Sequence, residues 1–329
     1  MQAKILIIRF SAIGDIVLAS PVLRILQEGL IGGAELHMVV RKRYFPVVEH
    51  NPRLTKVFTF ESTVQEVMEP LLLEGYDYII DLQNNLRSGL IKKRLGVLSF
   101  TVEKKNLAKF IWIKFGFKWN IPHVVSRYIE TLKTLGLSDD GKGLEFVIPS
   151  GVRVELPFDG FTAVVIGANH FGKRPDASNW ASIIHRIPGN IVLVGGKEEE
   201  MMSAALANHD RIFNVVNRLS LVESAWIVKQ AQMVVVGDTG LMHIAAAFGK
   251  DILSIWGCTR PGLGMSPWRA GEHSFAIEPS GLGDRPCSKL GDFCKHGQMN
   301  RCIHHIDLNQ LEKKAKMILA LPKASLSDD

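Results

Sequence analysis

The chain has 329 residues, of which 47% are hydrophobic, and its formal net charge at pH 7 is +6. This length is sufficient for two domains of ordinary size, each with its own core. No stretch has the unbroken apolar length of a transmembrane helix, and the N-terminus does not resemble a signal peptide, so we expect a cytoplasmic protein. The four cysteines all follow position 257, which argues against a disulfide framework as the organising device.

The positive charge is unevenly distributed. Residues 1–122 contain 17 Lys or Arg and 11 Asp or Glu, whereas residues 123–329 contain 22 of each, so the whole excess lies in the first part. An anionic partner of this part, such as a phosphorylated lipid surface or a nucleic acid, would explain the imbalance. A simple effect on solubility would explain it equally well.

The first part alternates short apolar strands with helices. Strands are predicted at 4–9, 36–40, 56–60 and 78–81, with helices between them. Pro21 either begins a second helix after Ser20 or kinks a helix that starts near Gly14. The alternation predicts a parallel, doubly wound sheet. The loop after the first strand then delivers Gly14 and Asp15 to the carboxyl edge, where ligands bind.

Residues 87–119 differ from the rest in being both basic and aromatic. They contain nine Lys or Arg and one acid, Glu103, interleaved with six Phe or Trp. Such a segment suits an anionic membrane surface or a phosphorylated lipid acceptor, and basic residues among aromatics also suit single-stranded nucleic acid. A solvated helix whose aromatics belong to the core is the structural alternative.

A region rich in Gly, Asp and Pro, at 136–160, predicts a boundary between a domain at 1–150 and a domain at 151–329. The second domain repeats the strand–helix pattern, with strands at 162–166, 191–194 and 212–216. A helix is predicted at 221–230 and a last helix at 308–319. We expect the last helix to pack back towards the N-terminal domain.

The stretch MVVVGDTGLMHIAAAFGKDILSIW, residues 233–256, predicts a buried strand, a tight turn, an alanine-rich helix and a further strand. The N-terminus of such a helix, just beyond a strand, is an anion site because its first N–H groups lack partners. Asp238 and Thr239 either cap this helix or, with Gly240, hold a diphosphate. His243, one turn later, either contacts the ligand or packs beneath it.

Two other loops of the second domain carry chemistry that suits a nucleotide diphosphate. Lys173 and Arg174 follow its first strand, where a cation could meet phosphate, although surface Lys-Arg pairs are common. Gly195 and Gly196 precede three glutamates, and a carboxylate in this place accepts ribose hydroxyls in doubly wound folds. Glutamates also favour the first turn of any helix.

Together these motifs resemble those of glycosyltransferase family 9, the ADP-heptose:lipopolysaccharide heptosyltransferases, over nearly the whole chain. The matching segments are ILIIRFSAIGDIVLASPVLRIL, IIDLQNNLRSG, GKRPDASNW, LVGGKEEE and VVVGDTGLMHIAAAFGKDILSIWG. The resemblance implies an α/β protein of GT-B architecture, with two doubly wound Rossmann-like domains facing an interdomain cleft. The N-terminal domain would bind the acceptor and the C-terminal domain the nucleotide sugar.

The resemblance also implies an inverting, metal-independent transfer of heptose from ADP-heptose to the inner core of lipopolysaccharide, with no cofactor. Asp15 matches the general base and Lys173 the cation beside the donor phosphates, and both are assigned as catalytic. The residues assigned to the donor are Glu199, Asp238, Thr239, Gly240 and His243. The residues assigned to the acceptor are Ser11, Gly14, Arg87 and Arg127.

Further expectations concern partners and place. The acceptor is an anionic, lipid-linked saccharide rather than a nucleic acid, so the enzyme would be peripheral to the cytoplasmic face of the inner membrane. Because the catalytic residues come from both domains, we expect turnover to require domain closure. The lysine loop departs from the family pattern, since Trp180 follows six residues after Arg174 instead of directly.

The C-terminal segment contains Cys287, Cys294 and Cys302, with three histidines nearby. Their spacing lacks the paired C-x2-C of structural zinc sites, so we interpret the segment as a loop with reduced thiols, with a mixed Cys/His metal site as the alternative.

Three other functions are weighed against this transfer. A nicotinamide-dependent oxidoreductase would need G-x-G-x-x-G after the first strand, where this chain has FSAIGD. A non-catalytic membrane- or nucleic-acid-binding protein would leave Asp15 and the Asp238 turn without a function. Within the transferases, another nucleotide sugar or a surface-polysaccharide acceptor is the alternative.

Overall fold

The computed structural model describes residues 2–168, 170–298 and 301–321. The chain forms two compact units. The first contains the residues up to Asn106 together with Ile121–Ser150, and the second contains Leu107–Asn120 together with the residues from Gly151 onward. In the described part of the chain, no helix is both long enough and apolar enough to cross a membrane.

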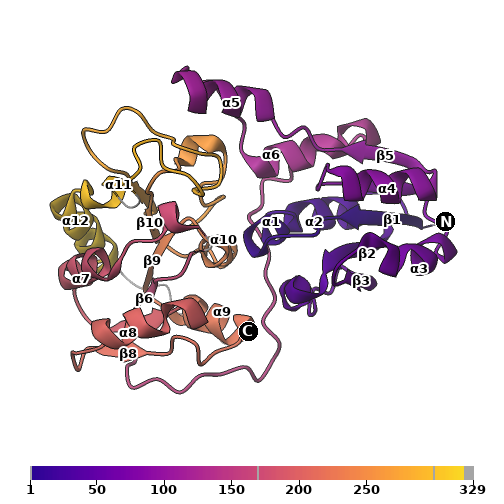
Figure 1. The fold of residues 1–329 in the computed structure, drawn as a ribbon. Helices are drawn as coiled ribbons and strands as arrows, with labels where there is room; N and C mark the ends of the chain where they lie inside the picture. The colour runs from indigo at the N-terminus through magenta and orange to yellow at the C-terminus, as the bar shows by residue number, and fades with distance from the viewer. Residues whose placement is uncertain (1, 169, 299–300, 322–329) are drawn as a thin grey trace. The chain divides into compact units, whose positions relative to one another are not determined.

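The first unit is built on a five-stranded parallel sheet of order β3-β2-β1-β4-β5 (Figure 1). The strands are β1 (Ala3–Ile8), β2 (Ala34–Arg41), β3 (Lys56–Phe60), β4 (Tyr78–Asp81) and β5 (Leu98–Thr101). The order of the strands reverses at β1, which lies between β2 and β4. The carboxyl end of β1 is therefore a topological switch point, where doubly wound folds bind ligands.

Helices and short 3-10 turns connect the strands of the first unit. They are α1 (Ile13–Val17), α2 (Ser20–Gly29), η1 (Lys42–Val47), η2 (Val64–Val67), α3 (Met68–Leu73), α4 (Leu86–Leu95), α6 (Val124–Ile129) and η3 (Glu130–Leu135). The ambiguity at Pro21 is resolved, because α2 begins afresh at Ser20 with Pro21 in its first turn, where its missing N–H is not needed.

The second unit is built on a six-stranded parallel sheet of order β11-β10-β9-β6-β7-β8. Its strands are β6 (Thr162–Val165), β7 (Ile191–Val194), β8 (Ile212–Asn214), β9 (Met233–Gly237), β10 (Ile252–Ile255) and β11 (Phe275–Ile277). The order reverses at β6, which has β7 on one side and β9 on the other. The two sheets confirm the predicted fold class of two doubly wound α/β units.

The second unit also contains helices and 3-10 turns. They are α5 (Asn106–Phe115), η4 (Phe171–Lys173), α7 (Ala177–Arg186), η5 (Lys197–Glu199), α8 (Glu200–Leu206), α9 (Leu221–Gln230), α10 (Gly240–Ala247), η6 (Pro261–Leu263), α11 (Arg301–His304) and α12 (Leu308–Leu319). Most of α5 belongs to this unit because Trp112 is buried, and a Cβ at Gly262 would lie only 2.7 Å from its ring.

The last helix, α12, packs on the second unit. The buried face of α12, Leu311, Ala315 and Ile318, is part of the hydrophobic core of the second unit. Arg186 of α7 reinforces this position, because its guanidinium contacts the carboxylate of Glu312 at 2.9 Å. The apolar periodicity predicted the helix correctly but did not indicate which sheet would receive it.

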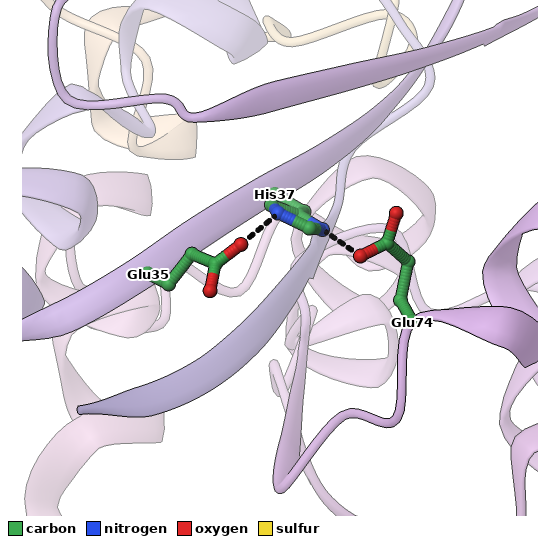
Figure 2. A group of neighbouring side chains, drawn as sticks. All are labelled: Glu35, His37 and Glu74. Carbon is green, nitrogen blue, oxygen red and sulfur yellow. Dashed lines mark hydrogen bonds and ion pairs between the residues drawn. The ribbon is translucent and has the colours of Figure 1, made fainter. Parts of the chain in front are cut away.

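A buried histidine lies near the amino ends of the strands of the first unit, at the edge opposite the switch point. His37 of β2 lies between Glu35 and Glu74, with Nε2 2.9 Å from Glu35 and Nδ1 3.8 Å from Glu74 (Figure 2). Both carboxylates also contact Lys4, and Glu74 contacts Lys56 at 2.6 Å. The acidic pair is thus already compensated by lysines, and the cluster is a charge network that supports the sheet.

This network predicts a dependence of stability on pH. Burial disfavours the imidazolium more than the glutamates favour it, so the pKa of His37 is lowered from its ordinary value. The unfolded chain therefore binds the proton first, and the free energy of unfolding falls as pH drops below about 6.5, by at most about 1.4 kcal/mol per pH unit. In His37→Gln we expect this loss to be absent when urea unfolding is compared at neutral and mildly acidic pH. His50→Gln, at an exposed position, is the control, and an unchanged pH dependence in His37→Gln would contradict the assignment.

Candidate functional site

The loop after β1 places Asp15 at the switch point of the first unit. Asp15 lies in α1, and its Oδ2 contacts Nη2 of Arg9 at 2.6 Å. Arg9 is almost fully buried and also donates from Nη1 to the carbonyl of Leu82 at 2.7 Å. Burial lowers the pKa of Arg9, but Asp15, Tyr128 and Asp81 together outweigh burial, so this pKa is raised. Arg9 therefore orients the aspartate and remains charged.

Two residues of α6 complete the surroundings of Asp15. The hydroxyl of Tyr128 lies 3.5 Å from Oδ1 of Asp15, and the Arg9 guanidinium stacks over the Tyr128 ring at 5.7 Å. Arg127 is mostly buried and donates to the backbone carbonyls of Pro122 and Glu103, at 3.1 and 3.4 Å. The side chain of Asp15 is 27% exposed, so a substrate can reach its carboxylate.

The other residues assigned to the acceptor lie at the same edge of the sheet. Ser11 and Gly14 flank Asp15 in sequence, with Ser11 half-buried and Gly14 buried in α1. Arg87 is exposed in the first turn of α4, which follows β4. Asp81, at the end of β4, is fully buried, and Ser88 and Lys92 donate to it at 2.9 Å. Asp81 therefore fixes the start of α4 and leaves Asp15 as the accessible acid of this edge.

In the second unit, the loops after β6 and β9 meet. Nζ of Lys173 lies 2.7 Å from Oδ2 of Asp238, and the hydroxyl of Thr259 donates to the same oxygen at 3.2 Å. The backbones also approach closely, since a Cβ at Gly237 would be 3.2 Å from the carbonyl oxygen of Lys173. The structure thus brings together two residues that are distant in sequence and that were both assigned to the donor phosphates.

The capping interpretation of this turn is wrong. Thr239 occupies the N-cap position of α10 but makes no capping hydrogen bond with its side chain, and Asp238 binds Lys173 instead. Among the described residues, the buried Oγ1 of Thr239 has no hydrogen-bond partner. The first N–H groups of α10, beginning at Gly240, are consequently available to an anion.

Glu199 connects the loop after β7 to the loop after β6. Its buried carboxylate accepts from the backbone N–H of Gly196 at 3.0 Å and contacts Arg174 at 3.3 Å. A Cβ at Gly167 would lie 3.0 Å from this carboxylate, so the glycine permits the close approach. His243, in α10, is also buried.

Sequence reasoning did not assign roles to Arg9, Tyr128 or Thr259. Arg9 stands at the end of the first predicted strand, but the sequence does not show that its side chain turns back to Asp15. Tyr128 is separated from Asp15 by more than one hundred residues. Their roles depend on tertiary packing, which no local pattern reports.

The two sheets and their switch-point loops define an α/β enzyme with two Rossmann-like units, one carrying an accessible acid and the other a cation beside an open helix N-terminus. The chain belongs to glycosyltransferase family 9 (heptosyltransferase), whose model matches residues 64–280. It is therefore a glycosyltransferase.

Known proteins agree with this assignment. The chain is 25% identical to lipopolysaccharide heptosyltransferase 1 of Escherichia coli strain K12 over 286 residues, covering 79% of this chain and 89% of the relative. Among solved structures, it resembles the glycosyl transferase family 9 protein from Veillonella parvula, with TM-score 0.78, 19% identity and coverage of 97% and 98%. It also resembles E. coli heptosyltransferase WaaC with ADP, with TM-score 0.71, 20% identity and coverage of 96% and 99%.

The ion pair at the second site can be tested by a double-mutant cycle. Lys173→Met leaves the buried Asp238 without its cation, and we expect the free energy of unfolding to fall by about 1–3 kcal/mol. Asp238→Asn removes the charge that needs a partner, so the double variant should lose less than the sum of the single losses. Urea unfolding measures all four proteins, with Lys197→Met at an exposed position as the control. Strict additivity would show that the pair does not couple the two loops.

Proposed function

We propose that this protein transfers a heptose from ADP-heptose to a hydroxyl of the lipopolysaccharide inner core, with inversion at the anomeric carbon. The family assignment supports the heptosyl transfer. The names of the relatives support the lipopolysaccharide acceptor, and the related structure with ADP supports the nucleotide. The observation that carries the proposal is the meeting of Lys173, Asp238 and the uncapped N-terminus of α10.

The second unit has the chemistry to bind the donor and stabilise its leaving group. As the bond between the anomeric carbon and the phosphate oxygen breaks, negative charge develops on the departing ADP. Lys173 and the N–H groups at the start of α10 are the groups that oppose this charge, and both are held in place before the reaction. Asp238, by holding Lys173, sets where that positive charge lies, and Glu199 would accept the hydroxyls of the ribose or the sugar.

The first unit has the chemistry to activate the acceptor. Arg9 occupies one oxygen of Asp15, and the carboxylate remains accessible to a sugar hydroxyl. Asp15 would accept the proton of that hydroxyl as its oxygen attacks the anomeric carbon from the face opposite the phosphate. Exposed Arg87 suits contact with an anionic acceptor, whereas Arg127, whose guanidinium is occupied by backbone carbonyls, would position α6.

The role of Asp15 is tested by Asp15→Asn, which keeps the shape of the side chain and removes the base. We expect kcat to fall by about 10²–10⁴-fold while the Kd for ADP changes less than about twofold, because the donor residues lie in the other unit. Product mass with ADP-heptose and truncated lipopolysaccharide acceptors gives turnover, and calorimetry gives ADP binding. Glu130→Gln, at an exposed position, is the control. Retained turnover in Asp15→Asn would refute the role of Asp15 as the base. Transfer only from a nucleotide sugar other than ADP-heptose would refute ADP-heptose as the donor.

We further propose that α5 and the residues after it contact the cytoplasmic surface of the inner membrane, where a lipid-linked acceptor is located. One face of α5 is anchored by Trp112, while Leu107, Phe110 and Phe115 are more than half exposed. Phe117 and Trp119 continue this apolar surface. Lys114 and Lys118 are exposed beside it, so the segment combines insertion of aromatic rings with attraction to anionic lipids.

This membrane contact is tested with vesicles that contain phosphatidylglycerol. Replacing Phe115 and Phe117 together by serine should weaken sedimentation with the vesicles about tenfold or more, because two aromatic side chains no longer enter the interface. Leu73→Ser, at another exposed apolar position in the first unit, should leave binding unchanged. Equal binding by the aromatic variant and the unaltered protein would exclude α5 as the contact.

A further inference from the structure

A buried, irregular segment follows β11 in the second unit. Residues 285–291 form neither helix nor strand, yet residues 285–288 are all buried. Irregular segments ordinarily run over the surface, because their backbone groups need partners. Here the partners come from the loops after β6 and β10, the two loops that bring Lys173 and Thr259 to Asp238. We call residues 285–291 the bracing segment.

One end of the bracing segment holds the loop that carries Lys173. The N–H of Gly172 donates to the carbonyl of Gly291 at 3.0 Å. Gly291 also lies against the lysine side chain, since a Cβ at this position would be 2.7 Å from Cγ and 3.1 Å from Cε of Lys173. The N–H of Gly291 donates to Oγ of Ser288 at 2.8 Å, which fixes the turn. A side chain at position 291 would therefore displace the stem of the lysine.

The other end of the bracing segment holds the loop after β10. Arg285, which is 3% exposed, donates from Nε to the carbonyl of Gly257 at 2.7 Å and from Nη2 to the carbonyl of Thr259 at 2.9 Å. Between them, the carbonyl of Cys258 accepts from the N–H of Cys287 at 2.9 Å. Three successive carbonyls of this loop are thus bound by two residues of the bracing segment.

The two held loops converge on one carboxylate oxygen. Oδ2 of Asp238 contacts Nζ of Lys173 at 2.7 Å and accepts from the hydroxyl of Thr259 at 3.2 Å. The loops are also joined to each other, because the N–H of Cys258 donates to the carbonyl of Gly172 at 3.1 Å. The bracing segment therefore supports both partners of Asp238, one through a side-chain stem and the other through the backbone.

We propose that the bracing segment positions the Lys173 ammonium for the diphosphate of the donor, with Gly291 and Arg285 as positioning residues. This inference rests on the proposed function, in which Lys173 opposes the negative charge on the departing ADP. Gly291 acts through the stem of Lys173, and Arg285 acts through the loop that carries Thr259. Electrostatic stabilisation requires charged groups that are fixed before the reaction, and the bracing segment supplies that restraint.

The role of Gly291 is tested by Gly291→Ala, with Gly297→Ala as the matched control. Both glycines have a left-handed φ, +83° and +67°, but among the described residues a Cβ at Gly297 has no atom within 4 Å. In Gly291→Ala we expect the Kd for ADP to rise about tenfold and kcat to fall about tenfold, because the ammonium is displaced. The Kd for adenosine, which has no phosphate, should change less than about twofold. Gly297→Ala should match the unaltered protein.

Calorimetry measures ADP binding, equilibrium dialysis measures adenosine binding, and product mass measures turnover. Unchanged ADP binding in Gly291→Ala would overturn the proposal, and so would an equal loss of ADP and adenosine binding. Ser288→Ala is a milder second variant, because it removes only the acceptor of the Gly291 N–H. It should raise the Kd for ADP about threefold and leave adenosine binding unchanged, and it decides the question if Gly291→Ala does not fold.

A measurement without ligand separates this inference from the proposed function. The coupling between Lys173 and Asp238, from the double-mutant cycle in urea unfolding, should fall to less than about half in the Gly291→Ala background. In the Gly297→Ala background it should be unchanged. Full coupling in Gly291→Ala would overturn the bracing role, whichever nucleotide binds. Reduced coupling in a protein that transfers no heptose from ADP-heptose would support the bracing role and refute the proposed function.

Discussion

The contact between the loop after β6 and the end of β9 is the constraint on which the second unit's site depends. At Gly237 the strand passes so close to the Lys173 backbone that a side chain would crowd it, and one residue later Asp238 binds the Lys173 ammonium. Because the backbone contact and the ion pair act at adjacent positions, the lysine is held by its main chain and by its side chain. A cation held in this way needs little reorganisation when charge develops beside it, which is the condition for electrostatic stabilisation.

The same ion pair explains why the N-terminus of α10 is open. A helix that begins with Asp-Thr-Gly would ordinarily be capped by one of the first two side chains. Here Lys173 and Thr259 occupy the Asp238 carboxylate, and Thr239 does not form the capping bond. The capping energy that is forgone is about 1 kcal/mol. The start of α10 thus lacks the side-chain cap that its local sequence favours, and this departure lies at the residues that we propose bind the donor.

The sequence predicted those elements whose periodicity arises from burial. The helices Leu221–Gln230 and Leu308–Leu319 end where their apolar patterns end, and β9 coincides with a run of valines buried on both faces. The strands β5 and β11, at the edges of the sheets, were not predicted. They have four and three residues and include exposed positions, so they lack the apolar signal of a central strand.

The sequence predicted the position of a candidate site residue only where that residue directly follows the end of a strand. Asp15, Lys173 and Asp238 could be placed at the edges of sheets because parallel strands deliver their loops to one edge. That Arg9 would hold Asp15 could not be predicted, since the interaction depends on the burial of the guanidinium against Leu82. Likewise, the sequence grouped Cys287, Cys294 and Cys302, but it could not show that Cys258 joins them, because that contact depends on the packing of two distant segments.

The packing changes which of the two units carries the excess positive charge. When charges are counted along the sequence, all the excess positive charge lies in residues 1–122. Residues 107–120, however, contain three lysines and no acid, and they pack with the second unit. Half of the excess therefore lies on α5 and the residues directly after it, which Trp112 fastens to the second unit, beside exposed aromatic rings. A segment that attracts an anionic surface would thus orient the second unit, which carries the donor residues. Charge counted by sequence position alone would have assigned that role to the first unit.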